Sequence, residues 1–322
     1  MSAPVIAAVI PAYRAAATVG AVIGAIGPEV GHIVVVDDAS PDDLAAAVAG
    51  SADPRVHLVR HPENRGVGAA TLSGYDAAVA LGAELLVKLD ADGQMDPRAI
   101  PALVRPIAQG RADYTKGNRF LHAPELAAMP RARRVGNAGL SFWTKLASGY
   151  WPIFDPTNGY TALHAALLPL LDRSRIAPRY FFETSLLLEL ARLRAVVEDV
   201  ALPARYAGEP SSLSQRRALG EFPPRLIAAT WRRIVRQYFV QDFTTVSLYL
   251  VAGLVLLAFG GVWGAWHWAL SIRDGVPATT GTVMLAVLPV ILGVQLWLQA
   301  IAQDIGNVPT RPIHDALPRM VR

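Results

Sequence analysis

Short apolar runs alternate with longer alanine-rich stretches over the first third of the chain. The apolar runs lie at residues 5–10, 33–36, 56–59 and 85–89, and the alanine-rich stretches at about 16–26, 42–49, 66–82 and 97–109. Short strands alternating with helices indicate an α/β fold with a mostly parallel sheet and helices on both faces. Such sheets bind ligands at the carboxyl ends of their strands, so we expect the functional residues there.

Two long uncharged runs follow near the C-terminal end. Neither Phe243–Ile272 nor Gly275–Gln303 contains Asp, Glu, Lys or Arg. Each run exceeds the roughly 20 residues that cross a hydrocarbon core of about 30 Å. We predict transmembrane spans near 246–269 and 281–302, joined by a short loop into a hairpin. The alternative is a pair of buried core helices, but neither run shows the amphipathic stripe expected when one face of a helix is solvated.

Arginines flank the two runs unevenly. Those before the first run and after the second are Arg225, Arg232, Arg233, Arg236, Arg311, Arg319 and Arg322, whereas the loop between the runs has Arg273 alone. Basic residues accumulate on the cytoplasmic side of membrane proteins. We therefore expect a multi-pass protein of the cytoplasmic (inner) membrane with its N-terminal region inside. Met1–Val9 has no basic start, so it is expected to begin a strand rather than a signal peptide.

An amphipathic segment precedes the first run. Ile227, Trp231, Ile234 and Tyr238 fall on one face of a helix, and Arg225, Arg232 and Arg236 fall opposite. This pattern favours a helix in the headgroup plane, with packing against the soluble domain as the alternative. The predicted organisation is a cytoplasmic domain at 1–220, an interfacial helix at 221–242, a transmembrane hairpin at 243–305 and a cytoplasmic tail at 306–322.

The composition narrows the possible functions. Charged residues make up 17% of the chain, against roughly 25% in an ordinary soluble domain, which agrees with a membrane anchor. The lack of cysteine excludes disulfides, thiolate metal sites and a cysteine nucleophile. The formal net charge of +4 gives no indication of a nucleic-acid partner. Neither a dinucleotide-binding Gly-x-Gly-x-x-Gly nor a P-loop follows a predicted strand.

Polar clusters follow three of the predicted strands. They are Pro11-Ala12-Tyr13, then Asp37-Asp38 with Ala39 to Asp42, and then Asp90-Ala91-Asp92-Gly93-Gln94. Two carboxylates one residue apart suit Mg²⁺, which takes one or two carboxylates together with substrate phosphates. Such pairs also occur in ordinary solvated turns, so the spacing alone does not decide between these uses.

These clusters, together with Asn64-Arg65-Gly66-Val67-Gly68, resemble the motifs of the inverting glycosyltransferases of family 2 over residues 5–215. The resemblance implies a GT-A fold, the Rossmann-like fold of nucleotide-diphospho-sugar transferases. It also implies Mg²⁺ or Mn²⁺ held by Asp90, Asp92 and Gln94. The residues that it implies for nucleotide-sugar binding are Pro11, Tyr13, Asp38, Asn64, Gly68, Asp90 and Asp155.

Four later segments narrow the resemblance. The segments resemble motifs of the polyisoprenyl-phosphate glycosyltransferases, which include dolichol-phosphate-mannose-synthase-like enzymes. They are residues 116–120, 129–137, 154–160 and 179–183. This similarity implies that Arg119, Arg133 and Asn137 hold the acceptor phosphate, with Asp92, Arg119 and Arg133 as catalytic residues. The segment Gly208–Leu213 departs from the family because it lacks the usual lysine.

The expected function is therefore metal-dependent, inverting transfer of one sugar from a UDP- or GDP-sugar to a polyprenyl phosphate at the cytoplasmic membrane face. One alternative is a processive polysaccharide synthase or another membrane-bound glycosyltransferase of family 2, although the Gln-x-x-Arg-Trp motif of the processive enzymes is missing. A non-catalytic membrane subunit that binds nucleotide-sugars is another. Small residues such as Gly260, Gly261 and Gly264 hint that the hairpin mediates homo-oligomerisation.

Overall fold

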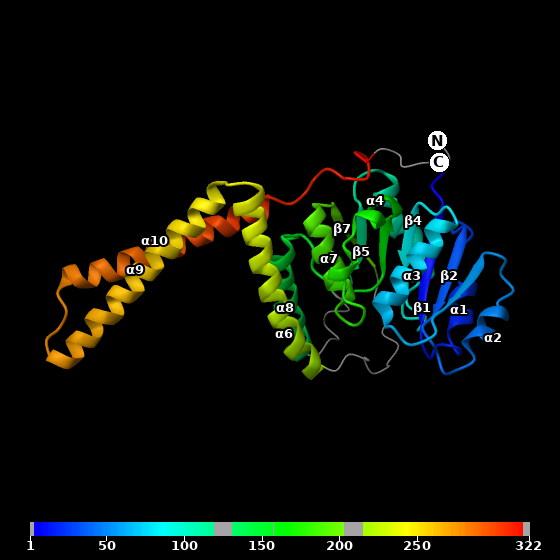
Figure 1. Cartoon of the computed structure of the whole chain (residues 1–322), viewed down its shortest axis with the longest axis horizontal. Helices are drawn as coiled ribbons and strands as arrows, with labels where there is room; N and C mark the ends of the chain where they lie inside the picture. Colours follow the sequence, from blue (N-terminus) through cyan, green and yellow to red (C-terminus); the bar gives the residue numbers. More distant parts are fainter. Residues whose placement is uncertain (1–2, 119–130, 157, 203–214, 318–322) are drawn as a thin grey trace. The chain divides into compact units, whose positions relative to one another are not determined.

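The computed structural model describes residues 3–118, 131–156, 158–202 and 215–317. The chain forms two units (Figure 1). The sheet unit comprises Met1–Ala229 and Pro309–Arg322, and the hairpin unit comprises Thr230–Val308.

A seven-stranded sheet in the order β3-β2-β1-β4-β6-β5-β7 forms the centre of the sheet unit. The strands are β1 (Ile6–Ala12), β2 (His32–Asp37), β3 (Val56–Arg60), β4 (Leu85–Lys88), β5 (Tyr114–Asn118), β6 (Thr161–His164) and β7 (Val197–Ala201). All neighbouring pairs are parallel except those of β6, which is antiparallel to both β4 and β5. The predicted mostly parallel sheet is confirmed. The apolar runs correspond to β1, β2, β3 and β4, whereas they did not indicate β5, β6 or β7.

Helices cover the sheet in the places that the alanine-rich stretches predicted. They are α1 (Val19–Gly24), α2 (Leu44–Ala49), α3 (Val67–Ala80) and α4 (Ile100–Ala108), the last preceded by the 3₁₀ turn η1 (Pro97–Ala99). All seven residues of β1 are buried, as expected for a strand covered on both faces. α3 packs closely on β1, because a Cβ at Gly74 would lie 2.3 Å from Val9 Cγ1.

Further helices follow in the chain. They are α6 (Arg131–Ser148), α7 (Phe182–Leu193) and α8 (Gln215–Val235), with the 3₁₀ segments η3 (Ala165–Leu170) and η4 (Arg173–Arg175). Ala147, Phe181, Phe222 and Leu226 form a buried apolar cluster that joins these helices. The first part of α8 therefore belongs to the sheet unit, within the segment that the amphipathic pattern assigned to a membrane interface.

The tail after the hairpin returns to the sheet unit. The buried carboxylate of Asp113 accepts hydrogen bonds from the backbone amides of Ile313 and His314, both at 3.0 Å, and contacts His314 Nδ1 at 2.7 Å. The His314 ring stacks on His164 with 4.2 Å between centroids. Residues on both sides of the hairpin thus belong to one folded unit.

The hairpin unit contains α9 (Thr245–Asp274) and α10 (Thr280–Gly306), preceded by the π-helical segment η5 (Arg236–Gln241). Both long helices are of sufficient length and apolar character to cross a membrane. Only 22% and 6% of their most apolar windows are buried, which disfavours the alternative of two core helices. The predicted spans at 246–269 and 281–302 lie inside these helices.

Small residues let α9 and α10 approach closely. A Cβ at Gly253 would lie 2.4 Å from Trp297 Cδ1, and one at Gly260 would lie 2.6 Å from the Ala286 carbonyl oxygen. The order of these contacts shows that the two helices are antiparallel. At one end of the pair the Thr245 hydroxyl donates a hydrogen bond of 2.7 Å to the Gln303 side-chain oxygen. The glycines that hinted at oligomerisation include ones used for packing within the chain, and the homo-oligomer remains a prediction.

A buried ion pair stabilises the base of the hairpin. Arg233 donates to both carboxylate oxygens of Asp304 at 2.8 and 2.9 Å, and the Tyr238 hydroxyl donates to the same carboxylate. Tyr238 is 2% exposed, whereas Trp231 is 70% exposed. The residues of the predicted apolar face therefore differ in burial: Trp231 is exposed, whereas Tyr238 packs inside the hairpin unit.

Candidate active site

The three polar clusters lie at one edge of the sheet. β1 lies between β2 and β4 and runs parallel to both, with Ala12 opposite Asp37 and Val9 opposite Lys88. Since the carboxyl ends of parallel strands coincide, the segments at Pro11–Tyr13, Asp37–Asp38 and Asp90–Asp92 lie at or just after neighbouring strand ends. The structure thus brings together the residues that the sequence placed after strands one, two and four.

Hydrogen bonds tie the loops at this edge to one another. The Arg14 amide donates to Ser40 Oγ at 2.6 Å, and the Thr18 hydroxyl donates to the Ala91 carbonyl at 2.6 Å. Arg14 has a left-handed backbone with φ of 56°. This turn leaves the Tyr13 ring 46% exposed, with the Arg14 guanidinium 5.4 Å from its centroid. An exposed aromatic ring at this edge suits stacking with a planar base.

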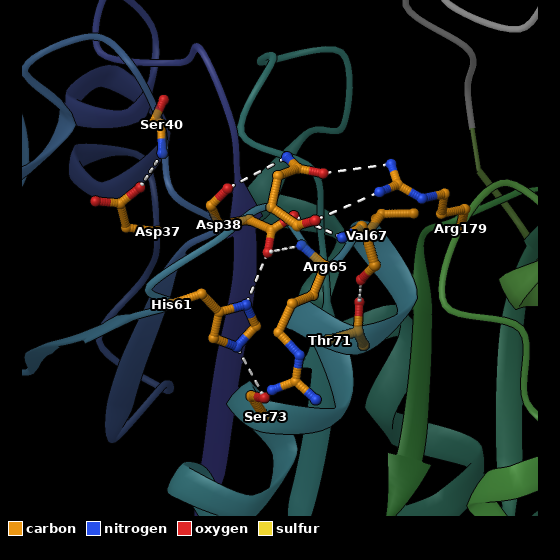
Figure 2. A network of polar contacts seen from close by, with 11 residues as sticks. Asp37, Asp38, Ser40, His61, Arg65, Val67, Thr71, Ser73 and Arg179 are labelled. Carbon is orange, nitrogen blue, oxygen red and sulfur yellow. Dashed lines mark hydrogen bonds and ion pairs between the residues drawn. The ribbon is translucent and has the colours of Figure 1, made fainter.

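Asp38 organises the loop between β3 and α3 (Figure 2). Its buried carboxylate accepts from the backbone amides of Arg65 at 2.9 Å and Gly66 at 2.7 Å. It also contacts His61 Nδ1 at 2.7 Å, and His61 Nε2 lies 3.0 Å from Ser73 Oγ. The observed bonds of Asp38 are therefore structural, and its contact with a nucleotide remains a prediction.

Asn64 joins this loop to a distant segment. Its side-chain amide donates to the Asp38 carbonyl at 3.2 Å, and its Oδ1 accepts from the Arg179 guanidinium at 3.3 Å. Arg179 also donates to the Asn64 carbonyl at 3.3 Å. The residue predicted to bind the nucleotide-sugar is thus held in place by a chain segment 115 residues away.

The glycines at the start of α3 allow two backbone segments to approach. Gly66 has φ of +92°, and a Cβ there would lie 2.5 Å from the Pro178 carbonyl oxygen. A Cβ at Gly68 would lie 2.5 Å from the Ala177 carbonyl oxygen and 2.6 Å from the Phe182 ring. These protein atoms explain a glycine at position 68 by close packing, and its contact with a nucleotide-sugar stays a prediction.

A buried lysine lies behind the acidic pair at the end of β4. Lys88 Nζ lies 2.8 Å from Asp90 Oδ1 and 3.1 Å from Glu183 Oε1, and Lys88 is 1% exposed. Burial alone lowers the pKa of this ammonium, but the two carboxylates more than offset that effect and raise it above the usual 10.5. Lys88 is therefore a permanent cation inside the sheet.

Sequence reasoning missed Lys88 and Glu183. The apolar pattern places Lys88 inside a buried strand, and a lysine at such a position is itself a sign of a buried acidic partner, because lysines are seldom fully buried unless they are paired. Gly159 completes the arrangement, since a Cβ there would lie 2.4 Å from Lys88 Nζ. Only the fold brings Glu183 and Gly159 next to this strand end.

Asp92 and Gln94 lie in the exposed turn that follows. The Gln94 backbone amide donates to Asp92 Oδ1 at 2.9 Å, and Gly93 has φ of +76°. The described residues include no group of three or more His, Asp or Glu side chains that could hold a metal. The oxygen donors of Asp90, Asp92 and Gln94 nevertheless fit a hard divalent cation that takes its remaining ligands from substrate phosphates.

The segment that contains Asp155 forms a buried turn beside the end of β5. Asp155 is 1% exposed. The Ser141 hydroxyl donates to the Phe154 carbonyl at 2.6 Å, and the Asn158 side-chain amide donates to the Gly117 carbonyl at 2.6 Å. The turn is therefore held from both α6 and β5.

The predicted acceptor-phosphate residues are only partly described. Arg119 lies outside the described residues, as do the side chains of Arg133 and Asn137. The backbone of α6 places Arg133 and Asn137 in the first two turns of that helix. Their roles remain predictions from the sequence.

Comparisons with known proteins agree with this geometry. The profile of Glycosyl transferase family 2 matches residues 7–169. The UDP-N-acetylglucosamine–dolichyl-phosphate N-acetylglucosaminyltransferase of Methanococcus voltae is 32% identical over 187 residues, covering 53% of this chain and 74% of that protein. The undecaprenyl-phosphate mannosyltransferase of Micrococcus luteus is 28% identical over 208 residues, covering 62% and 84%.

A solved structure shows the same fold. Glucosyl-3-phosphoglycerate synthase from Mycobacterium tuberculosis in complex with UDP aligns with a TM-score of 0.53 over 71% of this chain and 80% of that one, at 22% identity. The same enzyme with Mg²⁺ and UDP aligns with a TM-score of 0.52 over 71% and 79%, also at 22% identity. At this identity the likeness establishes the GT-A-like fold alone.

Proposed function

Because the chain belongs to glycosyltransferase family 2, we propose that it transfers one sugar from a UDP- or GDP-sugar to a polyprenyl phosphate, with inversion at the anomeric carbon. The observation that carries the proposal is the meeting of three polar strand ends at one sheet edge, at Tyr13, Asp38 and Asp90. The lipid acceptor is supported by the relatives from Methanococcus voltae and Micrococcus luteus, whose names include a lipid phosphate.

The donor side of the proposed site uses the strand ends already described. The exposed ring of Tyr13 would stack with the nucleobase, and Asn64 would contact the nucleotide from the loop held by Asp38. The acidic turn at Asp90, Asp92 and Gln94 would hold Mg²⁺ or Mn²⁺. When bound, such a cation neutralises the diphosphate leaving group as a Lewis acid.

The reaction needs little help with proton transfer. An oxygen of the acceptor phosphate attacks the anomeric carbon, and the bond from that carbon to the nucleoside diphosphate breaks with its electron pair leaving on the diphosphate. A phosphate monoester is already largely ionised near pH 7, because its second pKa is about 6. We therefore assign no general base. Asp155 would contact the sugar and would not accept a proton.

Arginines would hold the acceptor. In the proposed site Arg119 and Arg133 bind the lipid phosphate, with Asn137 beside them, since the planar guanidinium binds phosphate oxygens in a bidentate manner. The hairpin of α9 and α10 would anchor the enzyme in the cytoplasmic membrane, where a polyprenyl phosphate is embedded. Both ends of the hairpin lead back to the sheet unit, which fits an anchor with both ends on one membrane side.

The test is a transfer assay with the full chain in liposomes that contain undecaprenyl phosphate. Radiolabelled UDP- and GDP-sugars are screened with Mg²⁺ or Mn²⁺, and the lipid extract is tested for a product that carries one sugar. We expect Asp92→Asn to reduce turnover on the order of 100-fold or more. Glu29→Gln, an exposed carboxylate before β2 at the opposite sheet edge, is the matched control.

Three outcomes would overturn the proposal. A polymeric sugar product would indicate a processive synthase, and nucleotide-sugar binding without turnover would indicate a binding subunit. Full activity of Asp92→Asn would refute the assignment of the metal site. Arg133→Ala adds a test of the acceptor side, because it should weaken use of the lipid while donor binding stays near wild type.

A further inference from the structure

Asp199 lies on β7, the strand that closes the sheet beside β5. The two strands are parallel, with Lys116 opposite Asp199 and Asn118 opposite Ala201. None of the family motifs quoted from the sequence includes a residue of β7, so no motif singles out this carboxylate. Its contacts nevertheless reach the segments that carry the predicted chemistry.

One oxygen of Asp199 bonds to two segments at once. Asp199 Oδ2 accepts from the Asn118 side-chain amide at 2.6 Å and from the Phe154 backbone amide at 3.0 Å. Asn118 immediately precedes Arg119, and Phe154 immediately precedes Asp155. A single carboxylate oxygen therefore joins the chain leading to the predicted acceptor arginine with the turn leading to the predicted sugar contact.

The other oxygen is costly to bury. Asp199 Oδ1 is buried, and no described residue makes a hydrogen bond to it. Burial is the largest influence on this carboxyl and raises its pKa. The Phe154 backbone amide, the Lys116 charge and the Asn118 side-chain amide lower the pKa in part, and the nearby Asp155 carboxylate raises it further. A partly satisfied buried carboxylate destabilises a fold, so its presence here calls for a local purpose.

Other contacts hold the same turn by different atoms. Ser141 binds the Phe154 carbonyl and Asn158 binds the Gly117 carbonyl, and neither of these contacts involves the Asn118 side chain. Asp199 alone among these three residues joins the side chain at the end of β5 to the backbone of the turn. Asn158 ties the same turn to β5 through the Gly117 carbonyl, and Asp199 adds a second link, which reaches the residue directly before Arg119.

We infer that Asp199 is a positioning residue for sugar transfer, which holds the strand end before Arg119 and the turn at Asp155 in a fixed relation. The inference rests on the proposed function, because that function assigns the acceptor phosphate to Arg119 and the sugar to Asp155. It adds that donor and acceptor geometry are set together from β7, outside the family motifs.

The experiment compares Asp199→Ala and Asp199→Asn with Glu198→Ala. Glu198 is the neighbouring residue on β7, and its partly exposed side chain pairs with Arg111 at 2.8 Å, so it controls for loss of a carboxylate from this strand. The measurements are steady-state kinetics with undecaprenyl phosphate, nucleotide binding by calorimetry, and amide hydrogen exchange of residues 150–156.

We expect Asp199→Ala to lower kcat/KM for the lipid about 10-fold or more, since a charge-assisted contact at two segments is lost. Hydrogen exchange at the Phe154 amide should become faster, while the nucleotide dissociation constant changes less than about 2-fold. Asp199→Asn keeps an oxygen for the Phe154 amide and should recover part of both losses. Glu198→Ala should match wild type in all three measurements.

The outcomes separate this inference from the proposed function. If the wild-type chain transfers no sugar to any polyprenyl phosphate, the proposed function fails, and unchanged exchange at Phe154 would in addition refute the contact. If wild type is active and Asp199→Ala matches Glu198→Ala in kcat/KM and exchange, the positioning role is overturned. If Asp199→Ala does not fold, Asp199→Asn and Asn118→Ala decide by the same two measurements.

Discussion

Lys88 Nζ lies 2.8 Å from Asp90 Oδ1, so a buried cation neutralises the first carboxylate of the acidic pair from inside the sheet. Asp92, two residues further on, lies in the exposed turn. The two carboxylates at the end of β4 are therefore not equivalent, although their spacing in the sequence suggests a symmetric pair. Asp90 faces a permanent positive charge, whereas Asp92 lies where a cation and a diphosphate can approach.

This difference predicts unequal effects on metal-dependent nucleotide binding. We expect Asp92→Asn to weaken the affinity for UDP or GDP in the presence of Mn²⁺ by at least about 10-fold, and Asp90→Asn to weaken it less. Calorimetric titrations with and without Mn²⁺ measure both. Equal losses for the two variants would contradict the division between them.

Removal of Lys88 should destabilise the sheet unit. Lys88→Met leaves Asp90 and Glu183 next to each other without the shared cation, which costs about 3 kcal/mol of unfolding free energy. Arg98→Met is the matched control, because that arginine is 72% exposed in its pair with Asp96 and should contribute less than about 1 kcal/mol. Unfolding followed by circular dichroism compares the two variants, and similar stabilities would refute the buried network.

A methyl group at Gly159 should disturb the same network. Its Cβ would lie 2.4 Å from Lys88 Nζ and 3.3 Å from both Asp90 Oδ2 and Glu183 Oε1. The ammonium cannot move away without losing its carboxylates, so Gly159→Ala should cost about 1–3 kcal/mol. Gly20→Ala has open space within 4 Å and should be neutral or slightly stabilising in α1. Thermal unfolding that ranks the two variants the other way would contradict this account.

Acid should weaken the sheet unit at the site where the tail docks. Burial, followed by the neighbouring His314, lowers the pKa of His164 from 6.5 to about 4. Between these values the unfolded chain binds a proton that the folded chain does not, so stability falls as the pH falls from 6.5 to about 4. His164→Phe keeps a ring for His314 but does not titrate, and should lose part of this dependence.

Melting temperatures at pH 7.5 and 5 test this prediction. His57→Phe, on β3 towards the other edge of the sheet, provides the control and should retain the wild-type dependence. An unchanged pH dependence in His164→Phe would show that His164 does not cause the acid sensitivity.

The membrane orientation can be tested because the natural chain has no cysteine. A single cysteine at Ala278, in the exposed loop between α9 and α10, should react with an impermeant maleimide in intact cells. One at Ala80, exposed at the end of α3, should react only after permeabilisation. The reverse labelling pattern would place the sheet unit outside.

Local patterns predicted much of the fold for a definite reason. Apolar runs reveal strands such as β1 and β2 because most of the residues in these buried strands are apolar. The same patterns located the strand ends, and parallel pairing then required Asp38 and Asp90 to lie at one edge. The long helices α9 and α10 follow from uninterrupted apolar sequence alone.

The sequence did not reveal the contacts that join distant parts of the chain. β6 has four residues and inserts antiparallel between β4 and β5, too short to show a periodicity of its own. Asn64 and Arg179 are 115 residues apart, and Asp113 and His314 are 201 apart. No spacing rule connects such pairs.

The division has a physical basis. Burial and turn geometry constrain residues that are close together in the chain. They are therefore visible in the sequence as hydrophobic periodicity and as polar residues at the ends of strands. The partner of a buried charge is determined by the tertiary structure. Glu183, for example, contacts Lys88 from 95 residues away, and Asp199 contacts both Asn118 and Phe154. Those contacts depend on which strands become neighbours, and that is a property of the folded chain rather than of any local segment.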